Sequence, residues 1–206
     1  MKLGILGGTF DPIHLGHLLI AEQARATLGL DEVLFITAGQ PWMKEGTPIS
    51  DARHRLSMVR LAVGSNPFFH APAGEIDRPG PTYTVDTVEE LLSEADNGAQ
   101  LYLVLGVDSL KNLSRWKSPG RLLELCTLVA APRPGHADRD LGFIDEIQPG
   151  GSQKVALLEG PEVDISGAEI RRRVSQGLSV RYQVPEDVER YIYSHGLYRN
   201  VDGPGN

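Results

Sequence analysis

The stretch GGTFDPIHLGH, residues 7–17, directly follows the apolar opening MKLGIL and leads into a segment with helical spacing, HLLIAEQARATLGL. The opening predicts a buried strand that ends at the two glycines, and the later segment predicts a helix that begins near Gly16 or His17. A glycine turn between strand and helix exposes backbone N–H groups beside the positive helix end, which together attract an anion. Such a turn needs neither His14 nor His17.

The chemistry of this stretch leaves three interpretations open. Glycine and proline turns are common, so the histidines could be solvated side chains on an ordinary turn. A zinc site needs further ligands, which are not evident nearby. A nucleotide-phosphate site is favoured, although the P-loop pattern is absent and G-I-L-G-G lacks the G-x-G-x-x-G spacing. One helical turn places His14 and His17 on the same side, where both can donate to phosphate oxygens, more strongly when protonated.

Apolar runs alternate with amphipathic segments along the rest of the chain, which predicts strands over 31–39, 68–76, 101–106, 127–132 and 154–160. Helices are expected over 52–63, 82–95, 169–176 and 185–198, with a short one opening at Ser118-Pro119. This alternation predicts an α/β fold, a Rossmann-like, doubly wound, mostly parallel sheet with helices on both faces. We expect one domain over residues 1–199, with a small C-terminal helical part over about 166–199, and a disordered tail over 200–206.

Ligands of such sheets bind beyond the carboxyl ends of the strands. Three loops, Gly7–Gly16, Gly39–Lys44 and Gly106–Trp116, follow predicted strands, so we expect them to face one crevice. The polar, glycine-rich stretch 133–153 is expected to be a surface loop.

The composition is that of a globular protein: of 206 residues, 41% are hydrophobic and 23% charged, and 23 glycines and 14 prolines indicate many loops. A net charge of −7 argues against a general nucleic-acid-binding or basic membrane-binding surface. No apolar run reaches the roughly 20 residues that span a bilayer, and the N-terminus has no signal-peptide pattern. We expect a soluble, cytoplasmic protein whose single cysteine, Cys126, is buried.

Two motifs carry a family resemblance. The stretch GTFDPIHLGH resembles the signature of the nucleotidyltransferase superfamily, whose H-x-G-H core corresponds to residues 14–17. The stretch ISGAEIR at 165–171 is similar to the second motif of that superfamily, I-S-x-T-x-I-R. It departs at Gly167-Ala168, where a serine-threonine pair is usual, so one hydroxyl contact to a phosphate is missing. Both motifs in the right order are far more specific than either alone.

Within that superfamily, the chain resembles the bacterial nicotinate-nucleotide adenylyltransferases over nearly its whole length. The supporting stretches are QPWMK, RPGPTYTVDT at 78–87, GVDSL at 106–110 with Trp116 following, and the ending YIYSHGLY. Phosphopantetheine adenylyltransferases, a sister family, lack the P-T-Y-T-V-D-T segment. Self-association is common in the family, which leaves a homo-oligomer open.

The resemblance implies that ATP and nicotinate mononucleotide are joined to give deamido-NAD and pyrophosphate, in NAD biosynthesis. The phosphate of the mononucleotide is already a nucleophile, so direct in-line attack needs no covalent enzyme intermediate, and catalysis consists of positioning and charge stabilisation. Mg²⁺ would bridge ATP oxygens, held mainly by ATP and water, with no metal ligands from the protein. Alternatives are a different acceptor, either nicotinamide mononucleotide or phosphopantetheine, and a non-catalytic nucleotide-binding module.

The resemblance also implies site residues. The catalytic set is His14, His17, Lys44 and Arg171, with the histidines on the ATP phosphates and the two cations on the departing pyrophosphate. The implied ATP-binding residues are Gly8, Thr9, Phe10, His14, His17, Gly106, Asp108, Ile165, Ser166 and Arg171. The implied nicotinate-nucleotide-binding residues are Gly7, Gly8, Lys44, Tyr83, Thr84 and Trp116.

Several of these residues have ordinary alternatives. Lys44 could be a surface lysine, Asp108 could cap the following turn, and Trp116 could be a core tryptophan rather than a stacking platform for the nicotinate ring. Tyr83 and Thr84, at a predicted helix start, could present backbone N–H groups to the nicotinate carboxylate. That arrangement would favour the acid over the amide.

Overall fold

The computed structural model describes residues 1–41, 46, 48–95, 98–131 and 140–199. These residues include a six-stranded, entirely parallel sheet in the order β3-β2-β1-β4-β5-β6. The strands are β1 (Lys2–Gly8), β2 (Glu32–Thr37), β3 (Phe69–His70), β4 (Gln100–Gly106), β5 (Thr127–Ala131) and β6 (Val155–Leu157). The α/β prediction of a doubly wound parallel sheet is confirmed.

Helices cover both faces of the sheet because successive strand residues point to opposite sides. On β4, Val104 packs into one core, whereas Leu103 and Leu105 pack into the other. The Val104 core is covered by α1 (Leu15–Leu28), α2 (Ala52–Val63), α8 (Gly167–Ser175) and α9 (Glu186–Ser194). The opposite core is covered by α4 (Thr84–Glu94), α5 (Val107–Lys111), α6 (Pro119–Leu125) and α7 (Gly142–Ile147).

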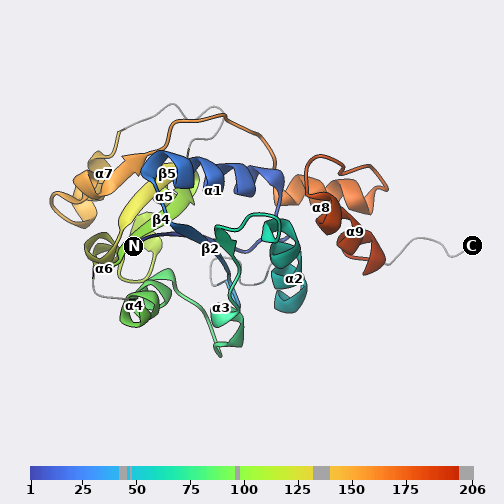
Figure 1. Cartoon of the computed structure of the whole chain (residues 1–206), viewed down its shortest axis with the longest axis horizontal. Coiled ribbons are helices and arrows are strands. Elements are labelled where there is room, and N and C mark those ends of the chain that lie inside the picture. The colour runs from blue at the N-terminus through green and yellow to red at the C-terminus, as the bar shows by residue number, and fades with distance from the viewer. Residues whose placement is uncertain (42–45, 47, 96–97, 132–139, 200–206) are drawn as a thin grey trace, which may run out of the picture.

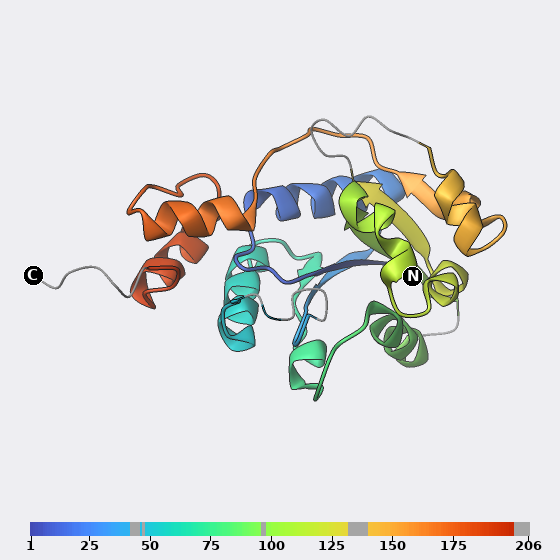
Figure 2. The same cartoon turned by 180° about the vertical axis from the view of Figure 1, so that it is seen from behind.

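The last two helices lie together at one end of the molecule, next to α2 (Figure 1). The view from behind shows α8 again beside one end of α1 (Figure 2). Their apolar residues Val174, Val188 and Ile192 join the same core as Leu6 of β1. The C-terminal end of the chain thus packs against the region where the N-terminal strand ends. The predicted tail over 200–206 lies outside the described residues.

Two expectations about loops and strands are wrong in part. The strand predicted over 68–76 is limited to β3, and a short helix, α3 (Gly74–Asp77), follows. Pro72 cannot donate to a sheet ladder, and the acidic residues of α3 favour its positive helix start. The stretch 133–153 contains α7, whose Ile144 is fully buried, and the 3₁₀ helix η3 (Gly151–Lys154). Residues 133–139 of this stretch lie outside the described part.

Two further properties concern the single cysteine and the length of the helices. Cys126 is buried as expected, and desolvation raises the pKa of its thiol to about 12, so it is an unreactive core residue. Among the helices that the structure describes, none is both long and apolar enough to cross a bilayer.

Candidate active site

The centre of the sheet has an open carboxyl edge. Strands β1 and β4 are adjacent, and the connections after them run toward opposite edges, so this is the switch point where α/β folds bind ligands. Gly7 and Gly106, near the ends of these strands, are exposed, and a Cβ at either position would meet no atom within 4 Å. Exposure is unusual for the middle of a parallel sheet. It leaves room for a ligand between the starts of α1 and α5.

His14 and His17 lie together at the start of α1. His14 is the N-cap residue, and the two rings stack with centroids 3.7 Å apart. The His14 backbone N–H donates to Nδ1 of His17 at 3.2 Å, so a neutral His17 carries its proton on Nε2. Gly16 permits this stacking, because a Cβ there would lie 3.1 Å from Nδ1 of His14. The expected placement of both rings on the same side is therefore what the structure has.

The environment of His14 determines the charge state of its ring. Its side chain is buried, and desolvation lowers the pKa of His14 from 6.5 to about 4. The ring is therefore uncharged at neutral pH in the nucleotide-free protein. In this state His14 can donate to a phosphate oxygen through a neutral N–H, and the stronger donation expected of a protonated ring applies only where the ring takes up a proton.

The second motif contacts the first directly. Nη1 of Arg171 donates to the Asp11 carbonyl at 2.6 Å, and Ile165 lies beside Gly16. A Cβ at Gly167 would lie 3.0 Å from that Asp11 carbonyl, so the departure from the usual motif coincides with a close backbone approach. A cavity of about 410 Å³ adjoins Asp11 and Arg171. The structure therefore brings together the two motifs that the sequence separates by about 150 residues.

At the start of α8, Ser166 caps the helix, its Oγ accepting from the Glu169 N–H at 3.2 Å. The two arginines after Arg171 pair with Glu169 on the surface. Only Arg171 is directed at the first motif.

Three site residues were missed in the sequence: Asp11, Arg55 and Tyr198. The Asp11 side chain is only 2% exposed and accepts from the Tyr198 hydroxyl at 2.7 Å and the Ser50 N–H at 3.2 Å. Burial and the Asp11 charge raise the pKa of Tyr198, so its hydroxyl keeps the proton that it donates. Arg55 is 1% exposed and lies behind the same loop. A signal was available for Arg55, because it shares a helical face with the apolar Met58, Val59 and Ala62.

The other predicted ATP-site residues differ in what they can offer. Phe10 is buried in the core, with φ of 50°, so only its backbone can reach a ligand. Thr9 is half-buried beside Gly8 at the end of β1. Gly106 is the N-cap residue of α5, so Asp108 does not occupy the capping position that was its alternative role. Lys44 lies outside the described residues.

The predicted nicotinate residues lie at the start of α4 and after the 3₁₀ helix η2 (Leu113–Arg115). Tyr83 is the N-cap residue of α4 and Thr84 its first residue, as expected. Trp116 is partly buried against the same core as Tyr83, so it is both a packing residue and accessible. Lys117 joins the two segments: it bonds both Asp86 oxygens at 2.8 Å, and its Nζ lies 4.7 Å from the centre of the Tyr83 ring.

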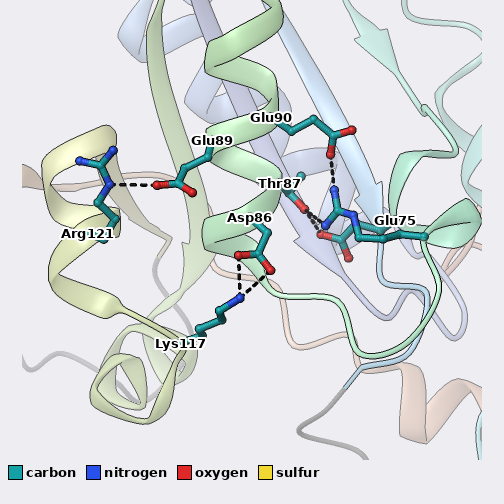
Figure 3. A network of polar contacts seen from close by, with 8 residues as sticks. Glu75, Asp86, Thr87, Glu89, Glu90, Lys117 and Arg121 are labelled. Carbon is teal, nitrogen blue, oxygen red and sulfur yellow. Dashed lines mark hydrogen bonds and ion pairs between the residues drawn. The ribbon is translucent and has the colours of Figure 1, made fainter.

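Further polar contacts hold α4 in place (Figure 3). On one side of the helix, Lys117 reaches Asp86 and Arg121 reaches Glu89 at 3.0 Å. On the other side, the Thr87 hydroxyl donates to the buried Glu75 at 2.6 Å, which ties α4 to α3. The N-terminus of α4 is therefore fixed from both sides.

The fold and the paired motifs define a nucleotide-binding protein of the nucleotidyltransferase class. The cytidylyltransferase-like family model matches residues 5–173. A solved structure, Plasmodium falciparum nicotinic acid mononucleotide adenylyltransferase complexed with NaAD, is similar to this chain with a TM-score of 0.77 and 18% sequence identity. The alignment covers 96% of this chain and 97% of the solved chain. This likeness confirms the fold.

Relatives with similar sequences identify the family more narrowly. A probable nicotinate-nucleotide adenylyltransferase of Dehalococcoides mccartyi is 47% identical to this chain. The alignment covers 96% of this chain and 97% of that relative. A protein of the same name from Roseiflexus sp. strain RS-1 is 50% identical to this chain, and the alignment covers 96% of this chain and 98% of that relative. The chain therefore belongs to the nicotinate-nucleotide adenylyltransferase family within the cytidylyltransferase-like proteins.

Proposed function

We propose that this chain transfers the adenylyl group of ATP to the phosphate of nicotinate mononucleotide, giving deamido-NAD and pyrophosphate. The observation that carries the proposal is the contact between Arg171 and the loop of the first motif, which gathers both family motifs at the exposed strand ends. The near full-length identity to nicotinate-nucleotide adenylyltransferases supports the choice of acceptor.

The reaction is a single displacement at phosphorus. An oxygen of the mononucleotide phosphate forms a bond to the α-phosphorus of ATP, and the bond to the bridging oxygen of the β-phosphate breaks, so pyrophosphate leaves with the electron pair. The nucleophile carries no proton that must be removed. The enzyme therefore has to align the two nucleotides and to stabilise charge on the α-phosphate and the leaving group.

The proposed catalytic residues divide this work. His17 donates through Nε2, which the His14 contact leaves protonated, and His14 donates through its neutral ring. Arg171 and Lys44 neutralise the triphosphate and the departing pyrophosphate. ATP would lie along Gly8, Thr9, Phe10 and Gly106, with adenine near Asp108, Ile165 and Ser166. Gly7 and Gly8 would lie beside the mononucleotide.

The acid would be selected over the amide at the start of α4. Backbone N–H groups of Tyr83 and Thr84 at the positive helix end suit a carboxylate, and an amide would leave a donor facing a donor. Trp116, partly buried against the same core as Tyr83, would stack on the pyridine ring through its accessible surface.

Magnesium belongs to the proposal as a companion of ATP. Among the described residues, no three histidine, cysteine or carboxylate side chains are grouped to hold a metal ion. The donors at the site, imidazole and guanidinium N–H groups, suit phosphate oxygens, so Mg²⁺ would be bound by the triphosphate and water. When bound, it supplies positive charge to the phosphates.

The proposal extends to the whole chain. Residues 1–199 would form one domain, in which the C-terminal helical part over about 166–199 supplies Arg171. A cytoplasmic location is included, because ATP is consumed as a substrate.

Substitution His17→Ala tests the catalytic assignment. Loss of a donor that acts on developing charge is expected to lower kcat by about 10²- to 10³-fold, while the ATP dissociation constant rises much less. Pyrophosphate release and calorimetric ATP binding measure the two effects. The exposed His70→Ala variant is the control. Unchanged turnover in His17→Ala would contradict the assignment.

A further inference from the structure

The guanidinium of Arg55 is buried behind the loops that end β1 and β2. Its Nη1 donates to the carbonyls of Thr9 at 2.8 Å and Ala38 at 2.7 Å, and its Nη2 donates to Gly39 at 3.0 Å. Its Nε donates to the carbonyl of Ser50 at 2.9 Å. One side chain therefore joins the first-motif loop, the loop after β2 and the start of α2.

The cost of this burial indicates that the contacts are specific. Among the described residues, Arg55 has no carboxylate within ion-pair distance, and desolvation lowers its pKa, partly offset by the charges of Asp11 and Asp51. A buried charge without a direct counter-ion is costly unless its hydrogen bonds are satisfied. Here four main-chain carbonyls accept from four of the five guanidinium N–H groups, in a planar fork that lysine does not possess.

The direction of the carbonyls fixes the direction of the neighbouring N–H groups. In a planar trans peptide, C=O and N–H point in opposite directions. The carbonyls of Thr9, Ala38 and Gly39 point at Arg55, so the N–H groups of Phe10, Gly39 and Gln40 point away from it. Among the described residues, no hydrogen bond from these three N–H groups to another part of the chain is found. They lie at the carboxyl ends of β1 and β2, where ligands of this fold bind.

We propose that Arg55 is a positioning residue for nucleotide transfer: it holds three carbonyls so that the N–H groups of Phe10, Gly39 and Gln40 face the phosphates of bound nucleotides. This inference rests on the proposed function, because it requires nucleotide phosphates at these loops. Arg55 touches no substrate itself, and acts through the loop backbone.

Arg55→Lys is the informative variant, because it keeps the charge and removes the fork. At a temperature well below unfolding, we expect kcat to fall at least about tenfold, and affinities for ATP and for nicotinate mononucleotide, each measured alone by calorimetry, to weaken. Arg55→Gln is expected to lower kcat and the two nucleotide affinities more than Arg55→Lys does. Arg60→Lys, on the same helix with an exposed side chain, is the matched control and should retain wild-type values.

Wild-type protein gives a second test that needs no substitution. In ¹H–¹⁵N spectra, titration with ATP and with nicotinate mononucleotide is expected to move the amide signals of Phe10, Gly39 and Gln40 far more than that of Gly74. Static signals for all three would overturn the inference, even if the Arg55 variants do not fold.

The outcomes separate the two proposals. If Arg55→Lys melts earlier but keeps wild-type kcat and affinities, Arg55 is only a stabilising residue and the inference fails. If wild-type protein binds both nucleotides and shifts the three amides but releases no pyrophosphate, the proposed function fails and the role of Arg55 in transfer fails with it, while the placement of the three N–H groups at bound phosphates stands. If wild-type protein binds neither nucleotide, both fail.

Discussion

Burial of His14 at the start of α1 gives the nucleotide-free protein a specific pH dependence. Well above pH 6.5 the ring is neutral in both folded and unfolded chains. Between pH 6.5 and about 4, only the unfolded chain takes up the proton, so stability falls as pH falls through this window, by roughly 3 kcal/mol in all. Below about pH 4 both states are protonated and the loss stops.

A His14→Gln variant removes this contribution. We expect its free energy of unfolding to decline less than that of wild type between pH 6.5 and 4, by roughly 3 kcal/mol over the window. Urea unfolding at a series of pH values measures the difference, and the exposed His70→Gln variant should follow wild type. Parallel pH profiles for wild type and His14→Gln would show that His14 titrates normally.

At the scale of single residues, the sequence indicated candidate site residues only where they lie in motifs. His14, His17 and Arg171 could be named because their spacing and order are recognisable, and the structure brings the two motifs into contact. Arg55 and Asp11 escaped because their partners are main-chain groups and buried side chains from distant segments. No local pattern specifies which carbonyl a buried guanidinium will meet. The neutral state of His14 escaped for the same reason, since it depends on tertiary burial.

Among the elements, the loop after β2 and α3 approach each other closely at Gly39. A Cβ at this position would overlap the backbone carbonyl of Glu75, so only glycine fits. Glu75 in turn accepts from Thr87 of α4. A single residue of α3 thus connects the loop held by Arg55 with the helix whose start is proposed to bind nicotinate.

Gly39→Ala is therefore expected to separate the loop from α3 and to cost about 1 to 3 kcal/mol, because backbone cannot move aside as a flexible side chain can. Gly74→Ala is the matched control, because Gly74 belongs to α3 and a Cβ added there would meet no atom within 4 Å. This substitution should be neutral or slightly stabilising. Thermal unfolding measures both, with a fall in Tm of several degrees for Gly39→Ala only. Equal Tm values for the two variants would rule out the close approach.

Strong apolar runs allowed most elements to be predicted, whereas short ones did not. The runs that became β1, β2, β4 and β5 are long enough to identify a buried strand. The stretch 68–76 holds only two strand residues before Pro72, and its last three residues belong to α3, which packs against the loop after β2. α7 was missed because its single fully buried residue, Ile144, gives too weak a periodicity within a glycine-rich stretch.

At the scale of the whole molecule, segments from both ends of the chain meet at the candidate site. The first motif follows β1, while Arg171 and Tyr198 come from the last part of the chain and meet at Asp11. The fold class could be predicted, because alternating strands and helices leave few topologies. The return of the C-terminal part to Asp11 could not, because no pattern in YIYSHGLY indicates which buried carboxylate its last tyrosine reaches.

The most direct test of the account is pyrophosphate release by the purified wild-type protein with ATP and magnesium. Nicotinate mononucleotide, nicotinamide mononucleotide and phosphopantetheine are supplied in parallel, and deamido-NAD is measured in the same samples. We predict release with nicotinate mononucleotide, equal amounts of deamido-NAD, and far lower kcat/KM for the other two acceptors. Comparable kcat/KM for the acid and the amide would contradict the carboxylate site at α4, and no release with any acceptor would contradict the proposed function.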